Sequence, residues 1–318
     1  MVSQQHQGYF TKVPFFGPGS HLGSCSTLKW PEEPQDLSGQ TAIITGSNTG
    51  IGEQTALYFA NHGARVILAC RTASKAKAAA ERIQQACARK AQVECMSLDL
   101  LSFDSVRKFG EAWAADARLR GDGGKVDYFI ANGGALFLNK QTTKDGLESN
   151  YQCNVLSHFL LTILLLPYLV LSSRPKICYV SSYAALTGNL DFNNLNLESL
   201  PEEWSIFTRF YRSFMAYGQS KYAQLILALA LQKRCLQSDD ERYRKICITA
   251  VHPGSLPPSL DLDSSDDRHR YGRLGYRDER SLRRTAMVQQ GHSFLHGSHC
   301  AKSVEESMRF RALVDFSC

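Results

Sequence analysis

Short apolar runs alternate with longer helical segments through the middle of this chain, and no other feature limits its fold so strongly. The expected strands are Thr41–Thr45, Arg65–Ala69, Val93–Leu98, Asp127–Ile130, Lys176–Ser181 and Ile246–Val251. The expected helices are Ile51–His62, Thr72–Arg89, 104–117, 147–171 and 213–235. Strands separated by helices pair in parallel, and right-handed crossovers cover both faces of the sheet. The sequence therefore predicts an α/β fold, a Rossmann-type doubly wound parallel sheet, as a single domain over residues 39–258.

The two ends of the chain lack this alternation. Residues 1–38 hold four prolines and few periodic apolar positions, so we expect an N-terminal arm. Between Ser259 and Ala286 there are seven arginines and six acidic residues, which leaves little apolar surface to bury. Residues 259–318 are therefore predicted to form an atypical, partly disordered C-terminal segment.

Charge, cysteine spacing and hydropathy exclude several classes of protein. A net charge of +6 over 318 residues is mild, and we expect no nucleic acid partner. The ten cysteines form no CxxC pair and the N-terminal residues hold no apolar signal region, which indicates a reducing, cytoplasmic location. The apolar run Phe159–Leu171 has 13 residues, whereas a membrane span needs roughly 20, so we expect a buried helix and no transmembrane segment.

A glycine-rich turn lies between the first expected strand and the first expected helix. Its residues are Gly46, Ser47, Asn48, Thr49, Gly50, Ile51 and Gly52. Glycines in this place let the backbone turn sharply and approach a pyrophosphate, whose charge then lies at the N-terminus of the helix. A glycine pattern also occurs in ordinary loops, but the strand–turn–helix context favours a dinucleotide site.

Cys70 and Arg71 follow the second expected strand, where NAD-binding sheets place an acidic residue against the adenosine ribose. A guanidinium without a neighbouring carboxylate binds a 2′-phosphate through paired hydrogen bonds. This predicts NADP as the cofactor in preference to NAD. The alternative is that Arg71 is only a surface residue at the end of a strand.

Tyr217 and Lys221 are four positions apart in an expected helix, which places the phenol and the ammonium on one face. An ordinary tyrosine has a pKa of about 10, too high for a base at neutral pH. A neighbouring ammonium stabilises phenolate, so we expect Lys221 to lower the pKa of Tyr217. The alternative is a tyrosine on an amphipathic helix without a chemical role.

Taken together, these motifs resemble the short-chain dehydrogenase/reductase family over about residues 39–258. The other matching pieces are Asp99-Leu100, Asn132-Gly133-Gly134, Asn154, Ser181-Ser182 and His252-Pro253-Gly254. The stretches VILACR, KDGLE, NVLSHFLLT and AVHPG are similar to the branch that holds the retinol dehydrogenases and the WW domain-containing oxidoreductases. No WW domain is expected, because Trp30, Trp113 and Trp204 are far apart.

The resemblance implies four catalytic residues. Tyr217 would exchange a proton with the substrate oxygen, and Lys221 would lower its pKa and hold the nicotinamide ribose. Ser182 would hydrogen-bond the substrate oxygen; it matches the family serine better than Ser181 because of the residues that follow it. Asn154 would support the lysine through a water.

The same resemblance implies a cofactor site and a function. Besides the glycine turn and Arg71, the residues that would line the cofactor are Asp99, Leu100, Asn132, Gly133, Tyr217, Lys221, Pro253 and Gly254. The function would be that of an NADP-dependent oxidoreductase, which transfers hydride between the nicotinamide and a small apolar alcohol or carbonyl, such as a retinoid, a steroid or a lipid aldehyde. Family members often dimerise through the helices around Asn154 and Tyr217, which makes a homodimer the expected assembly.

Three features depart from the family pattern. The family sequence NNAG appears as Ala131-Asn132-Gly133-Gly134. Ser182 and Tyr217 are 35 positions apart, which predicts an insert around Asn189–Tyr211 that forms a flap on the substrate side. Where the family places a threonine for the nicotinamide amide the chain has Pro258, which offers neither hydroxyl nor N–H, and Ser255 or Ser259 would replace it. These departures leave an alternative function, a catalytically impaired nucleotide-binding scaffold that acts through protein partners.

A cluster of residue types that bind metals lies near the C-terminus. It consists of His292, His296, His299 and Cys300. Imidazole and thiolate bind zinc, but a complete site also needs supporting partners around its ligands. We expect a polar terminal segment here and no metal site.

Overall fold

The structure is a computed structural model that describes residues 36–137, 139, 141–198 and 206–253. The chain divides after Asp36 into two units, and the fold is that of the second unit, which begins at Leu37. The predicted C-terminal segment 259–318 and nearly all of the predicted N-terminal arm lie outside the described residues, so the domain boundaries stay predictions.

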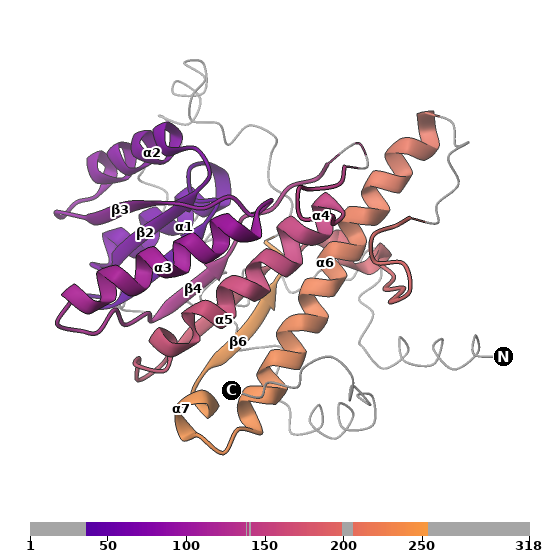
Figure 1. Ribbon diagram of the computed structural model, residues 1–318. Helices are drawn as coiled ribbons and strands as arrows, with labels where there is room; N and C mark the ends of the chain where they lie inside the picture. The colour runs from indigo at the N-terminus through magenta and orange to yellow at the C-terminus, as the bar shows by residue number, and fades with distance from the viewer. Residues whose placement is uncertain (1–35, 138, 140, 199–205, 254–318) are drawn as a thin grey trace, which may run out of the picture. The chain divides into compact units, whose positions relative to one another are not determined.

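Six parallel strands form one sheet in the order β3-β2-β1-β4-β5-β6 (Figure 1). The strands are β1 (Thr41–Thr45), β2 (Arg65–Cys70), β3 (Gln92–Ser97), β4 (Tyr128–Ala131), β5 (Lys176–Val180) and β6 (Cys247–Val251). Successive strands are added on one side of β1 as far as β3 and on the other side from β4 onward. This reversal confirms the predicted doubly wound sheet, and it places the topological switch point at the carboxyl ends of β1 and β4, where such folds bind ligands.

Helices cover both faces of the sheet. They are α1 (Gly50–Asn61), α2 (Ala73–Ala86), α3 (Phe103–Leu119), α4 (Ser149–Tyr151), α5 (Ser157–Leu169), α6 (Ile206–Leu236) and α7 (Glu241–Arg244), with a π-helical segment η3 (Gln152–Leu156) and a 3-10 helix η4 (Tyr183–Thr187). In Figure 1, α3, α5 and α6 lie in front of the strands, and α1 lies behind them. The sheet is therefore the middle of three layers.

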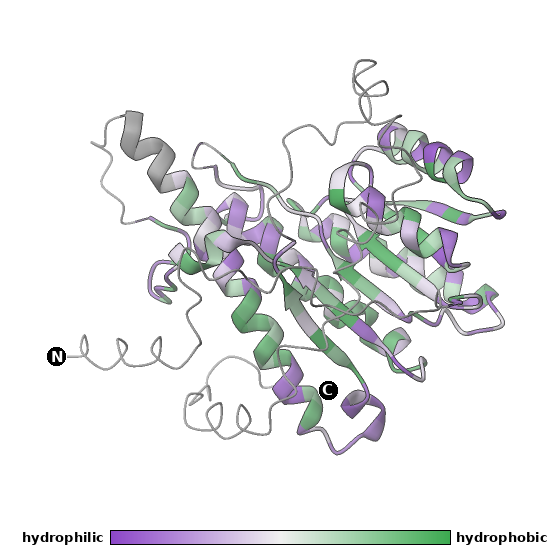
Figure 2. Ribbon diagram, turned by 180° about the vertical axis from the view of Figure 1, so that it is seen from behind, coloured by the Kyte–Doolittle hydropathy of each residue, from purple (hydrophilic) through white to green (hydrophobic). Residues whose placement is uncertain are grey.

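Each face of the sheet has its own apolar core. Successive strand residues point to opposite faces, so Ile43 packs in one core with Trp113 and Leu161, whereas Ile44 packs in the other with Phe59. Figure 2 shows the central strands as mostly apolar, whereas α2 carries many polar residues. Fully buried strands of this kind explain why the sequence shows continuous apolar runs instead of alternation.

Two helices differ from their predicted form. The stretch predicted as one helix over 147–171 is α4, then the π-helical segment Gln152–Leu156, then α5. Helix α6 begins at Ile206 and not at residue 213, so the last residues of the predicted insert Asn189–Tyr211 belong to this helix and not to a flap.

The stretch Ser149–Leu169 is the one helical stretch in the described ranges that is long and apolar enough to cross a membrane. More than half of it is buried inside the protein, and Leu161, Leu165 and Leu169 lie fully in the core against the sheet. This burial is typical of the central helix of a folded domain and agrees with the predicted buried helix.

Candidate functional site

The three glycines of the glycine turn meet three different demands at the carboxyl end of β1. Gly46 has a φ of 61° and donates its N–H to Ala69 O at 2.9 Å. Gly50 has a φ of 59°, and no described atom lies within 4 Å of the point where a Cβ would stand. A Cβ on Gly52 would stand 2.5 Å from Gly46 O, so only glycine fits there. The turn thus presents bare backbone at Gly50 and packs tightly on either side of it.

The loop after β4 holds the glycine turn in place. Asn132 Nδ2 donates to Thr45 O at 2.9 Å and to Gly46 O at 3.3 Å. Gly133 N donates to Thr45 Oγ1 at 2.8 Å, and a Cβ on Gly133 would stand 2.8 Å from Leu100 Cδ1. The structure therefore brings Leu100, Asn132 and Gly133 together against the turn, and a hydrogen bond fixes the glycine that replaces the family alanine.

An ion pair that the sequence does not reveal supports the turn from α2. Glu53 is buried in the first turn of α1, and Arg82 Nε and Nη2 donate to its two carboxylate oxygens at 2.7 and 3.0 Å. Arg82 Nη2 also donates to Asn48 O at 3.1 Å. A buried carboxylate beside a phosphate-binding turn needs a neutralising partner, and Arg82 supplies that charge. The two residues are 29 positions apart, and no spacing rule connects them.

Arg71 lies exposed directly after β2, and no ion pair to it is found among the described residues. Cys70, the last residue of β2, is buried with its Sγ 3.6 Å from Ser47 Oγ. Burial raises the pKa of the Cys70 thiol, so the thiol stays uncharged. Arg71 therefore follows β2 at the position in the chain where an NAD site has a carboxylate, and its neighbour Cys70 contacts the glycine turn.

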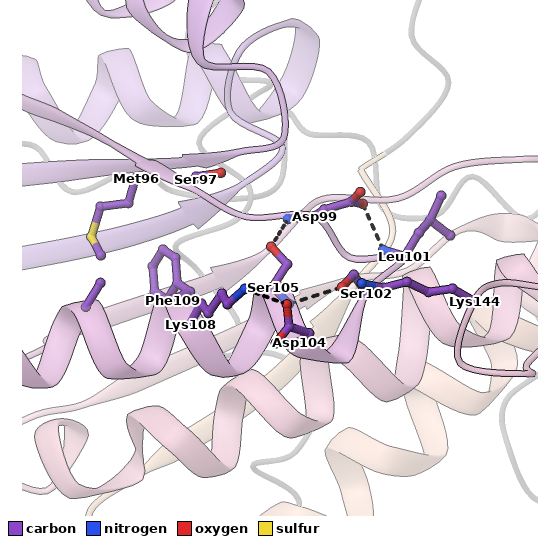
Figure 3. A pocket seen from close by; sticks show the side chains of 11 residues that line it. Met96, Ser97, Asp99, Leu101, Ser102, Asp104, Ser105, Lys108, Phe109 and Lys144 are labelled. Carbon is purple, nitrogen blue, oxygen red and sulfur yellow. Dashed lines mark hydrogen bonds and ion pairs between the residues drawn. The ribbon is translucent and has the colours of Figure 1, made fainter.

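Asp99 follows β3 and lies at the edge of a hollow of about 610 Å³ (Figure 3). Its Oδ1 accepts from Leu101 N at 3.0 Å, and its own N–H donates to Ser105 Oγ at 2.9 Å. Residues of β3 and α3 such as Met96 and Phe109 form the apolar part of the hollow. Asp99 is the only predicted site residue that lines this hollow, which is therefore distinct from the cluster around the predicted catalytic tyrosine.

Ser182 and Tyr217 meet where the end of β5 lies against α6. The Ser182 side chain lies beside the Tyr217 phenol and acts to lower its pKa, and its Oγ accepts from Ala184 N at 3.2 Å. The neighbouring Ser181 is buried and donates to Lys221 O at 2.8 Å. Of the two serines, Ser182 is therefore the one placed beside the phenol.

The pKa of Tyr217 moves in the direction opposite to the predicted one. Burial raises the pKa of the Tyr217 phenol above its ordinary value, and the neighbouring Ser182 side chain only partly opposes this. Lys221 Nζ lies 5.6 Å from the centre of the tyrosine ring and donates instead to Val180 O at 2.8 Å and Gln224 Oε1 at 3.0 Å. Burial therefore dominates in this arrangement, and Tyr217 is a protonated phenol at neutral pH, while the lowering of its pKa by Lys221 stays a prediction.

Lys221 is only 3% exposed, and burial lowers its pKa to about 8. A Cβ on Gly134 would stand 3.2 Å from Lys221 Nζ and 3.1 Å from Asn154 Oδ1. The ammonium and the amide thus converge on Gly134, which is itself exposed. The structure thus brings Lys221 and Asn154 together beside Gly134, where no side chain fills the space.

Asn154 lies inside the π-helical segment, and its side chain joins three parts of the site. Its Oδ1 accepts from Ala135 N at 3.0 Å, and its Nδ2 donates to Ala135 O at 3.1 Å and to Ser220 Oγ at 2.8 Å. Ser220 in turn donates to Tyr217 O at 2.7 Å. Asn154 therefore ties the loop after β4 to the helix that carries Tyr217, while its predicted water link to Lys221 stays a prediction.

The end of β6 lies next to η4. His252 Nδ1 accepts from Tyr183 N at 3.2 Å, and the half-buried Pro253 follows it. The remaining predicted positions lie outside the described residues: Gly254, Ser255, Pro258, Ser259, His292, His296, His299 and Cys300.

Ser182, Tyr217 and Lys221 form what we call the Tyr217 cluster. The glycine turn, the loop after β4 and the Tyr217 cluster all lie at the carboxyl end of the sheet. The bare backbone at Gly50, with which the N-terminus of α1 begins, and the guanidinium type of side chain at Arg71 fit the phosphates of a dinucleotide. Fold and site together define an α/β protein of the dinucleotide-binding class, with Tyr217 at the same edge of the sheet as the glycine turn.

Comparison with known proteins identifies the family. The family model described as short chain dehydrogenase matches residues 40–194. Human retinol dehydrogenase 13 is 38% identical over 218 residues, which cover 69% of this chain and 59% of the relative. The WW domain-containing oxidoreductase of Drosophila melanogaster is 36% identical over 240 residues, which cover 74% of this chain and 54% of the relative. The chain belongs to the short-chain dehydrogenase family, whose members bind a nicotinamide cofactor, and to the branch of these relatives.

The matched region is only part of these relatives. Mouse retinol dehydrogenase 12 is 36% identical over 228 residues, which cover 72% of this chain and 65% of the relative. The chain thus spans between about half and two thirds of the length of the curated relatives it matches. What the complete relatives do is therefore a matter for proposal in this chain.

Solved structures support the same fold. An uncharacterised protein from Mycobacterium paratuberculosis matches with a TM-score of 0.60 and 28% identity, over 83% of this chain and 80% of that one. RhlG of Pseudomonas aeruginosa, solved as a complex with NADP, matches with a TM-score of 0.52 and 23% identity, over 76% of this chain and 79% of that one. At this identity the second match shows the fold alone.

Proposed function

We propose that this chain is an NADP-dependent oxidoreductase that transfers hydride between the nicotinamide and an apolar alcohol or carbonyl. The observation that carries the proposal is the placement of the Ser182 side chain beside the Tyr217 phenol, one helical turn from the buried Lys221 and at the sheet edge that bears the glycine turn. A phenol and a hydroxyl placed side by side bind one substrate oxygen together. Membership of the short-chain dehydrogenase family supports this class of reaction.

Apolar side chains on the segments around Tyr217 support an apolar substrate. The exposed ones are Leu136, Tyr183, Leu186, Phe192, Phe214 and Met215. They come from the loop after β4, from the segment after β5 and from α6 just before Tyr217. The segment after β5 packs closely on α6, since a Cβ on Gly188 would stand 2.4 Å from Gly218 O. Exposed apolar groups on the segments that lead into a polar site favour an apolar ligand, and the relatives named retinol dehydrogenases support one of retinoid size.

The chemistry of the chain's own residues fits both directions of the reaction. When bound, the nicotinamide supplies or accepts the hydride. In reduction, the protonated Tyr217 donates its proton to the substrate oxygen while the Ser182 hydroxyl hydrogen-bonds the same atom. The ammonium of Lys221 stabilises the phenolate that remains. Lys221, whose Nζ lies close to Gly134, is the residue that would hold the nicotinamide ribose, and Asn154 would support it through a water.

Arg71 supports NADP over NAD, because its guanidinium lies at the end of β2 without an ion-pair partner among the described residues. Replacing Arg71 by Ala should reduce the preference for NADPH over NADH by roughly tenfold or more, since one charged hydrogen-bonding partner of the 2′-phosphate is lost. Calorimetric titration with both nucleotides measures the ratio. Equal affinities for NADPH and NADH in the unaltered protein would contradict the assignment of NADP.

The reaction is tested by NADPH consumption with a panel of apolar aldehydes that includes retinal. We expect turnover by the unaltered protein and a loss of at least a hundredfold in Tyr217→Phe, because the proton donor is gone. Tyr168→Phe is the control, since this tyrosine packs edge-on against Trp113, away from the site. NADPH binding without turnover of any aldehyde would instead support the nucleotide-binding scaffold, and full turnover by Tyr217→Phe would contradict the mechanism.

A homodimer and a cytoplasmic location complete the proposal. The homodimer would form through the helices that carry Asn154 and Tyr217, as in the family. Light scattering of the purified chain measures its mass, and a monomer at micromolar concentration would contradict the dimer. Fractionation of cells that express the chain tests its location.

A further inference from the structure

A histidine with no role in the proposed reaction is buried between the strand that leads into the glycine turn and the segment that carries Asn154. His158 is 0% exposed and lies in the first turn of α5, directly after the π-helical segment. Its Nδ1 lies 3.1 Å from Asn154 O, and its Nε2 lies 2.9 Å from Thr45 Oγ1. Thr45 is the last residue of β1, so this one ring bridges the strand that leads into the glycine turn and the segment that carries Asn154.

The hydrogen bonds around this ring have a defined direction. A carbonyl oxygen only accepts, so Nδ1 carries the proton and donates to Asn154 O. Burial lowers the pKa of His158 to about 4, so the ring is neutral and Nε2 is an acceptor. The Thr45 hydroxyl donates to Nε2, since its other acceptor, Ile130 O, is farther away at 3.4 Å. The same hydroxyl accepts from Gly133 N at 2.8 Å.

Both ends of this chain of hydrogen bonds are groups of the site. Gly133 belongs to the loop that packs on the glycine turn. Asn154 lies where the helix is widened to a π-turn, and such turns frequently occur at functional sites. The side chain of Asn154 holds Ala135 and Ser220, so the position of its backbone sets the position of those contacts.

We propose that His158 is a positioning residue that fixes the Asn154 carbonyl with one ring nitrogen and, through Thr45, the Gly133 amide with the other. Both effects rest on the NADP site of the proposed function, but only the effect on turnover rests on the proposed reaction. The ring touches neither the substrate side nor the predicted phosphate site, and it acts only through Asn154 and Thr45. Loss of each ring nitrogen should therefore produce a different defect.

Two substitutions separate the two nitrogens. The side-chain amide of His158→Asn keeps an N–H near the place of Nδ1 and leaves Thr45 without its partner. His158→Gln keeps a polar end near the place of Nε2 and leaves Asn154 O without its donor. We expect His158→Asn to raise the NADPH dissociation constant roughly tenfold with kcat within about threefold, and His158→Gln to show the reverse, since each loses one buried hydrogen bond. The proposal is overturned if both variants change the NADPH dissociation constant and kcat alike, or if the two variants exchange these effects.

A second experiment keeps the test valid if a variant is less stable. In a Thr45→Val background, His158→Asn should cause no further rise in the NADPH dissociation constant, because both changes break the same bond. Additive effects overturn the proposal. Thr162→Val is the matched control: its buried hydroxyl donates to His158 O at 2.7 Å but does not touch the ring. This variant should lower the thermal unfolding midpoint and leave NADPH binding unchanged.

Calorimetric titration with NADPH requires no substrate, so it separates this proposal from the proposed function. If the unaltered protein binds NADPH but reduces no aldehyde, the proposed reaction fails. The expected tenfold loss of NADPH affinity in His158→Asn, set against an unchanged His158→Gln, then still supports the positioning role, and equal affinities in the two variants overturn it.

Discussion

The glycine turn and the Tyr217 cluster lie on the same edge of the sheet, but the turn depends on backbone conformation and the cluster on polar side chains. The turn is built from backbone: two glycines have positive φ, and a third has no room for a Cβ. The cluster is built from polar side chains whose pKa values burial has shifted, upward for Tyr217 and downward for Lys221. The function of the turn should therefore depend on its shape, and the function of the cluster on the charges and hydrogen bonds of its side chains. Added volume should damage the turn, and removal of polar atoms should damage the cluster.

The largest effect is expected from the serine in the cluster. Ser182→Ala should lower kcat about a hundredfold or more with little change in NADPH affinity, because one hydrogen bond to the developing oxyanion is lost. Ser181→Ala is the control, since this serine donates to Lys221 O and faces away from the phenol. It should cost roughly 1 kcal/mol of unfolding free energy and leave kcat nearly intact. Equal losses of kcat in both variants would break the distinction between the two serines.

The buried charge of Lys221 should appear in the pH dependence of stability. Its folded pKa is about 8 and its ordinary value is 10.5, so between these values the unfolded chain binds a proton that the folded chain has released. The free energy of unfolding should therefore rise with pH across this window, by up to roughly 3 kcal/mol in total, and this contribution is lost as the pH falls to about 8. Lys221→Met should remove the rise.

The measurement is urea unfolding of the nucleotide-free chain at several pH values between 8 and 10.5. The difference in unfolding free energy between the wild type and Lys221→Met at each pH isolates this one group from the tyrosines and cysteines that also titrate there. Lys75→Met, at an exposed lysine, is the control and should run parallel to the wild type. If the plot of unfolding free energy against pH for Lys221→Met also runs parallel to that of the wild type, buried charge does not distinguish the cluster from the turn.

A third prediction concerns the open face of the turn. Gly50 and Gly39 both have positive φ, and neither would bring a Cβ within 4 Å of a described atom. Replacing either by Ala should therefore cost a similar 1–2 kcal/mol or so of stability, the usual cost of a left-handed residue. Only Gly50→Ala should weaken NADPH binding, by roughly tenfold, because its methyl group would occupy the approach to the pyrophosphate. Calorimetric titration measures this, and equal affinities in the two variants would remove shape as the feature that sets the turn apart.

Much of the fold could be predicted from the sequence for a local reason. Strands buried on both faces are continuous runs of β-branched and apolar residues, and Thr41–Thr45 was predicted with its observed bounds. The motif residues also reach one edge of the sheet because parallel strands all end there. Placement of Ser182 beside Tyr217, and of Asn132 beside the glycine turn, follows from strand order alone.

The features that the sequence could not supply depend on contacts between distant residues. The π-turn at Asn154 accompanies a link from His158 to Thr45 across 113 positions, which no periodicity reveals. The direction of the Tyr217 pKa shift depends on how far burial outweighs the effect of the neighbouring Ser182, and a spacing of four residues says nothing about burial. Local patterns thus predict which residues reach the site, and tertiary packing decides their chemical state.

The smallest effect should come from the one charged support of the turn. Arg82 binds both oxygens of Glu53 and also Asn48 O, a fork that lysine cannot reproduce. Arg82→Lys should raise the NADPH dissociation constant about threefold, since the loss of one hydrogen bond to the turn loosens it without adding volume. Arg242→Lys is the matched control, because Arg242 forms the same kind of fork with Asp240 on the exposed helix α7. A loss for Arg82→Lys larger than that for Gly50→Ala would mean that charge, and not shape, also governs the turn, and the contrast between the two regions would then be one of degree.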